Sequence, residues 1–131
     1  TANQRWCGVD WLTMESLAVK GIHVLGDATL SGPGMPKSGS MANQHGKICA
    51  AAVAALLRGR PVDPNPMIMN ACYSFVDGQS AMHVTSIHQY DAAQKTMVPV
   101  KGAGGVSAKA SELEGTYAWG WARNIWADTL G

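Results

Sequence analysis

Apolar residues recur at helical spacing in the middle of the chain. They lie in an alanine-rich segment that favours helix: Ile48, Ala51, Ala52, Ala55 and Leu56. A loop dense in glycine and proline precedes this segment, and Ser38 or Ser40 is a suitable residue to begin a helix. Gly59 and Pro61 supply the stop signal. The pattern therefore predicts a helix from about Ser40 to Arg58.

Upstream of this helix, a β-branched run bounded by glycines extends from Gly21 to Asp27. Such a run is typical of a buried strand that ends in a turn, and we predict one here. The residues through Lys20 mix tryptophan and valine with polar residues, which predicts an irregular segment with a short strand.

Downstream, three prolines between Arg60 and Pro66 exclude regular helix and indicate a linker. Three segments beyond the linker have strand character: Asn70 to Val76, Ala81 to Tyr90, and Thr96 to Val100. Asp77-Gly78 is a hairpin signal between the first two, so an antiparallel meander is the economical arrangement for these strands.

The last element opens with a capping-box pattern, in which Ser111 and Glu114 are expected to satisfy each other's exposed amides. The helix beyond it carries four large apolar residues on one side: Leu113, Tyr117, Trp121 and Ile125. We expect it to dock this aromatic face onto a large surface. The elements together predict an α+β fold, in which a strand-loop-helix unit packs on a three-stranded antiparallel sheet and a C-terminal helix.

Composition narrows the possible functions. The chain of 131 residues is 47% hydrophobic and 15% charged, which suits a globular domain, and its formal net charge of +1 forms no basic stripe for nucleic acid. The longest strongly apolar run, Ile48 to Leu57, is far shorter than the roughly 20 residues that cross a bilayer. No signal sequence is visible, which carries no weight for an internal fragment.

The cysteines and histidines form no recognisable metal or disulfide pattern. Cys7, Cys49 and Cys72 are an odd number at wide spacing. The histidine pair His83 and His88 lies on one predicted strand with side chains on opposite faces, so no metal site is predicted. A cysteine-histidine hydrolase also lacks support, because no motif places a base beside Cys72.

Several residues could serve a cofactor, although each has an ordinary structural role as well. Gly26 would let a ligand approach the backbone and Asp27 could bind sugar hydroxyls, but both could simply form a turn. Lys37 and Ser38 lead into a helix whose positive end favours an electron-rich group, or they are a solvated loop and a cap. Cys72 on its strand could be a small core residue.

Four segments in order make a more specific pattern. They are Gly-Ile-His-Val-Leu-Gly-Asp-Ala at 21–28, Met-Pro-Lys-Ser-Gly-Ser-Met-Ala-Asn-Gln-His-Gly-Lys at 35–47, Asn-Ala-Cys-Tyr-Ser at 70–74, and Tyr-Ala-Trp-Gly-Trp-Ala-Arg-Asn-Ile-Trp-Ala-Asp-Thr-Leu-Gly at 117–131. From Trp6-Cys7 to Gly131 the chain resembles the carboxy-terminal portion of the flavoprotein subunit of flavocytochrome c sulfide dehydrogenase. That family belongs to the FAD-dependent pyridine nucleotide-disulfide oxidoreductase superfamily.

The resemblance implies a role for each matching residue. Asp27, after Gly26, would bind the ribityl part of FAD, and Cys72 would be one half of a redox-active disulfide whose partner lies upstream. Trp121 matches an aromatic residue close to the flavin. The residues expected against the isoalloxazine ring are Lys37, Ser38, Met41, Ala42 and Gln44. By the same resemblance, residues 1–60 are a truncated remnant of the FAD-binding domain and residues 61–131 a flavin-capping, interface domain.

The implied activity is oxidation of sulfide through the disulfide and FAD, with electrons passing to a periplasmic c-type cytochrome subunit. Because the chain has no Gly-x-Gly-x-x-Gly loop, we expect it to bind FAD weakly or not at all and to be inactive alone. We also expect a dimer that covers apolar surface near Ile22, Val24 and the alanine-rich helix. Alternatives are the tail of a sulfide:quinone reductase and a non-enzymatic assembly module.

Overall fold

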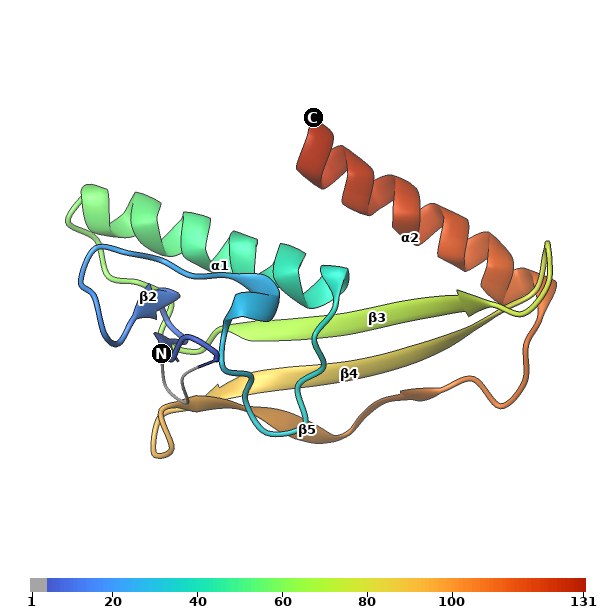
Figure 1. Cartoon of the computed structure of the whole chain (residues 1–131), viewed down its shortest axis with the longest axis horizontal. Coiled ribbons are helices and arrows are strands. Elements are labelled where there is room, and N and C mark those ends of the chain that lie inside the picture. The colour runs from blue at the N-terminus through green and yellow to red at the C-terminus, as the bar shows by residue number, and fades with distance from the viewer. Residues whose placement is uncertain (1–4) are drawn as a thin grey trace.

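The computed structural model describes residues 5–131 and has the predicted α+β architecture. A three-stranded antiparallel sheet carries an irregular N-terminal segment on one face, and helix α1 (Gly39–Leu57) runs along its edge. Helix α2 (Glu112–Leu130) rises away from the far end of the sheet (Figure 1).

The sheet confirms the predicted meander. Its strands β3 (Met67–Phe75), β4 (Ala81–Asp91) and β5 (Thr96–Val106) are adjacent in that order, and β3 and β5 are longer than predicted. The hairpin signal is also confirmed, since the Asp77 carboxylate accepts the backbone N–H groups of Gln79 and Ser80 in the β3–β4 turn.

Helix α1 agrees closely with the predicted helix. The Ser38 hydroxyl caps it by accepting the N–H of Met41 at 3.1 Å. Gly59, with φ of +62°, ends it in the left-handed conformation that glycine adopts without strain. The segment between Gly59 and β3 has no helix or strand, as expected for the proline-rich linker.

The predicted buried strand from Gly21 to Asp27 is wrong. One bridge joins His23 to Glu15, and the chain then forms a 3-10 turn, η1 (Gly26–Ala28). Ile22 is 53% exposed, because the described chain pairs this segment on one side only, with the N-terminal hairpin. A β-branched run is buried as a strand only where neighbouring strands and helices cover it.

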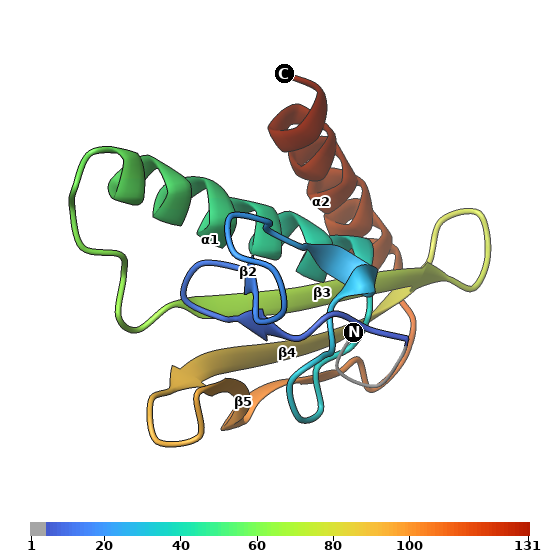
Figure 2. The ribbon, with the colours of Figure 1, turned by 60° about the vertical axis from the view of Figure 1, so that its left-hand side comes forward.

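The hairpin itself consists of two very short strands, β1 (Val9–Asp10) and β2 (Glu15–Ser16), where one was predicted. It supplies Trp11 and Met14 to the main core. This core lies between the N-terminal segment, α1 and one face of the sheet (Figure 2), and contains Val9, Trp11, Met14, Met35, Met41, Ile68 and Met97.

The apolar surface that we expected near α1 is present in part. Ile22 and, at the end of α1, Leu57 are exposed, whereas Val24 packs against the core.

Only the first turns of α2 are packed against the sheet. Leu113 and Tyr117, two of the four residues of the predicted apolar stripe, are more than half exposed. Two tryptophans of α2 pack against aromatic rings on β3. The ring centroids of Trp121 and Tyr73 are 5.9 Å apart, and those of Trp119 and Phe75 are also 5.9 Å apart.

The base of α2 depends on Gly115, which is buried against the carbonyl of Gln79 with no room for a side chain. Gly120 of the same helix has open space around it. We predict that Gly120→Ala raises the free energy of unfolding by about 1 kcal/mol through helix propensity. Gly115→Ala should lower it by about 1–3 kcal/mol, because the methyl group pushes α2 off the sheet. Urea denaturation followed by circular dichroism compares the two variants, and equal stabilisation by both would contradict the packing.

Candidate functional site

The η1 turn is held against α1 through Gly26. Its N–H donates to Nδ1 of His45 at 3.1 Å, and its φ is +61°. A Cβ on Gly26 would lie 3.1 Å from the Cβ of Ala42, so a side chain would separate the turn from the helix. The next residue, Asp27, is exposed beside this junction.

Lys37 ties the same turn to the loop that precedes α1. Its Nζ donates to the backbone carbonyls of Asp27 at 2.8 Å and Thr29 at 2.6 Å. The ammonium group also lies 4.1 Å from the centre of the Trp6 ring, a cation–π contact. The loop therefore delivers Ser38 to the start of α1 in a defined position.

A chain of polar contacts joins the start of α1 to Cys72. The Ser38 hydroxyl donates to Oδ1 of Asn70 at 2.7 Å, and the Cys72 thiol donates to the same oxygen at 3.3 Å. The thiol is free and half-buried. The structure thus brings Gly26, Asp27, Lys37, Ser38, Ala42 and Cys72 into one connected region.

The other predicted site residues occupy different surroundings. The side chain of Met41 is 1% exposed and belongs to the core, while Gln44 is partly exposed one turn further along α1. Trp121 reaches the site strand through Tyr73. Because successive strand residues face opposite sides, Trp121 lies across the sheet from the Cys72 thiol.

The donor set at the start of α1 suits an electron-rich ring edge. The first N–H groups of a helix have no acceptor within it, and the helix dipole adds positive potential there. The Lys37 ammonium contributes a positive charge nearby, and the exposed Asp27 carboxylate can accept hydrogen bonds from hydroxyl groups. These residues therefore fit a flavin with its ribityl chain.

His45 is a residue of this region that sequence reasoning missed. It is 2% exposed, contacts Trp11 edge-on, and has a buried Nε2 without a hydrogen-bond partner. Burial, reinforced by the Lys37 charge and opposed by Asp27, lowers its pKa from 6.5 to about 4. Its helical spacing to Met41 in the core and to Ile48, which packs against the core, is the sequence signal that could have indicated burial.

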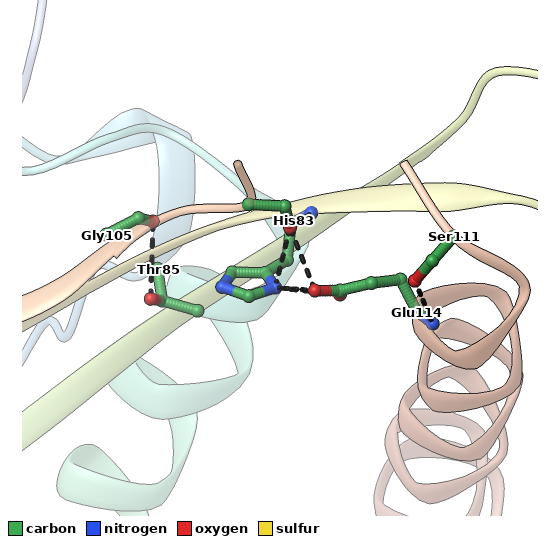
Figure 3. Close-up of polar contacts among 6 residues, drawn as sticks. His83, Thr85, Gly105, Ser111 and Glu114 are labelled. Carbon is green, nitrogen blue, oxygen red and sulfur yellow. Dashed lines mark hydrogen bonds and ion pairs between the residues drawn. The ribbon is translucent and has the colours of Figure 1, made fainter. Parts of the chain in front are cut away.

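A second polar cluster connects α2 to the sheet (Figure 3). Nδ1 of His83 on β4 lies 2.7 Å from the Glu114 carboxylate, and the Ser107 hydroxyl donates to Glu114 at 2.9 Å. The hydrogen bond from His83 lowers the pKa of Glu114. The predicted capping box is therefore only half right: Ser111 caps the Glu114 N–H, but the Glu114 carboxylate turns to the sheet.

The opposite orientation of His83 and His88 is confirmed. His83 lies opposite Tyr73 and His88 opposite Ile68 in the β3–β4 pair, and Tyr73 and Ile68 face opposite sides of β3. Within residues 5–131, no three histidine, cysteine or acidic side chains gather as a metal site would require. In the same part of the chain, neither helix is both long and apolar enough to span a membrane.

Comparison with known families identifies a matching family model. The family model described as flavocytochrome c sulphide dehydrogenase, flavin-binding, matches residues 64–130, which is just over half of the chain. The chain therefore belongs to this flavin-binding family and is part of a flavoprotein. The match includes the sheet with Cys72 and helix α2 with Trp121, while the η1 turn and the start of α1 precede it.

The lowered pKa of His45 predicts a pH-dependent stability. In the unfolded chain the His45 side chain has its ordinary pKa of 6.5, and in the folded chain its pKa is about 4. The contribution of His45 to the free energy of unfolding is therefore fully present above pH 6.5. It falls by roughly 3 kcal/mol as the pH is lowered toward 4. His45→Gln, whose amide oxygen can still accept the Gly26 N–H, should lose less stability over this range.

Urea titrations at several pH values measure this difference. The pKa values of His88 and Glu114 are also lowered, so the wild type and the His45→Gln variant both lose some stability in acid. Curves for wild type and His45→Gln that run parallel would contradict the assignment.

Proposed function

We propose that this chain is the carboxy-terminal part of the flavoprotein subunit of a sulfide dehydrogenase, with Cys72 as one half of its redox-active disulfide. The family match over the strand that bears Cys72 is the main support. The hydrogen-bonded connection between Cys72 and the start of α1 adds to it, because both would have to face one cofactor.

FAD would supply a group that accepts two electrons from thiols and releases them singly. In this proposal Asp27 holds the ribityl hydroxyls, with Gly26 permitting close approach, and the start of α1 with Lys37 lies against the electron-rich ring edge. Residues 1–60 then belong to the FAD-binding domain and residues 61–131 to the domain that covers the flavin.

Cys72 takes part in a thiol–disulfide step. Hydrosulfide attacks one sulfur of the disulfide, its sulfur forms a new S–S bond as a persulfide, and the other cysteine leaves as a thiolate. The sulfur–sulfur bond of the disulfide thereby accepts the electron pair from sulfide. The partner cysteine lies upstream of this chain in the proposed subunit.

The electron acceptor in this proposal is a c-type cytochrome subunit, and the location is the periplasm. The family name pairs the flavin-binding part with a cytochrome, and no Cys-x-x-Cys-His haem motif occurs in this chain. The exposed aromatic residues of α2, including Trp119 and Trp126, suit an interface. A membrane-docking tail fits less well, because α2 carries the single cation Arg123 against three acidic residues.

The flavin spectrum of the complete subunit with FAD and its cytochrome tests this proposal. We expect sulfide to bleach the flavin in wild type and in Cys49→Ser, whose cysteine lies within α1. Cys72→Ser should retain bound FAD but lose sulfide-dependent bleaching, because no disulfide can form. Bleaching of Cys72→Ser at the wild-type rate would refute the role of Cys72, and the isolated chain should show neither bound flavin nor turnover.

A further inference from the structure

Asn70 is the residue through which Cys72 is connected to helix α1. It lies on β3, is 1% exposed, and shares the core-facing side of the strand with Cys72. We propose that Asn70 is the positioning residue of the redox centre, coupling the state of the Cys72 thiol to the N-cap of α1. This inference rests on the proposed function only for the redox role of Cys72.

The hydrogen bonds determine which way the carboxamide faces. Nδ2 of Asn70 donates to the carbonyl of Val84 at 3.4 Å, and a carbonyl can only accept. Oδ1 therefore faces Ser38 and Cys72. Since the Ser38 oxygen accepts the Met41 N–H, its single hydrogen is free to donate to Oδ1.

The contact with Cys72 exists in one chemical state of the sulfur. Oδ1 carries no hydrogen, so the Cys72 sulfur must donate, and only a protonated thiol can do so. A thiolate or a disulfide sulfur would place acceptor against acceptor at a partly buried contact. That loss is unfavourable unless the carboxamide turns, and turning would also break its contacts with Ser38 and Val84.

The backbone on both sides of Asn70 is held to helix α1. The Ser40 hydroxyl accepts the N–H of Ala71 at 3.1 Å and donates to the carbonyl of Met69 at 3.4 Å. These bonds attach the residues on both sides of Asn70 to the first turn of α1. The carboxamide is therefore the direct link between the Cys72 sulfur and Ser38, and coupling through it is reciprocal.

The equilibrium of Cys72 with glutathione tests the coupling in the chain itself. In this exchange the thiol and oxidised glutathione give a mixed disulfide and reduced glutathione, and peptide mass spectrometry reads the extent at Cys72. Asn70→Leu removes the acceptor at similar size and should raise the equilibrium constant roughly fivefold. Asn70→Asp keeps acceptor oxygens beside the thiol and should leave the constant unchanged or lower it.

The contrast between these variants separates positioning from packing. Both change the buried site, so a purely structural role would shift the equilibrium in the same direction in both. Equal shifts, or no shift in Asn70→Leu, would overturn the proposal.

Hydrogen exchange gives a second test that needs no change at Asn70. In a Cys7→Ser, Cys49→Ala background, methylthiolation of Cys72 should accelerate exchange of the Met41 amide, and reduction should restore it. The Glu114 amide, capped by Ser111 in the same manner, is the matched control and should not respond. Unchanged Met41 exchange would refute the coupling even if the Asn70 variants fail to fold.

Two variants at the cap sharpen the exchange experiment. Ser38→Thr retains the hydroxyl and should keep the response, whereas Ser38→Ala should abolish it because the link to Asn70 is gone. A response that persists in Ser38→Ala would contradict the proposed route.

These outcomes are independent of catalysis. If sulfide fails to bleach the flavin in the complete subunit while Cys72 and Met41 respond as described, the proposed function fails and the coupling stands. If Cys72→Ser abolishes bleaching while Cys72 and Met41 do not respond, the function stands and the coupling fails.

Discussion

The attachment of the first turn of α1 to the free edge of β3 is the constraint on which the site depends. An edge strand leaves backbone N–H and C=O groups without a strand partner, and here Ser40 satisfies two of them, on Ala71 and Met69. This contact places Ser38 beside Asn70. The capped helix start and the Cys72 strand are therefore positioned by one set of hydrogen bonds.

The η1 turn is attached to the same helix, although it lies far from β3 in sequence. Gly26 packs on Ala42 and donates to His45, while Lys37 binds two carbonyls at the turn. His45 can accept the Gly26 N–H only while it is neutral, which its burial favours. The turn, the loop and the strand thus meet at α1.

Helix α2 is attached differently, through contacts concentrated at its base. Gly115 lies against the β3–β4 turn and Glu114 binds His83, whereas the far end is joined to α1 by the exposed Lys47–Asp128 ion pair. An exposed pair of this kind contributes at most about 1 kcal/mol. Much of the aromatic surface of α2 is exposed, including Tyr117, Trp119 and Trp126.

The sequence by itself determined the two helices and the meander, because caps, prolines, turn residues and alternation act between near neighbours in the chain. The family followed from the resemblance of four ordered segments, and the family match supports it. Tertiary structure alone decided that the run from Gly21 to Asp27 is not a buried strand, since burial depends on neighbours elsewhere in the chain. It alone showed that Glu114 binds His83 and that Asn70 joins Ser38 to Cys72. Those contacts unite segments some thirty residues apart, and no local pattern encodes which distant donor will meet which acceptor.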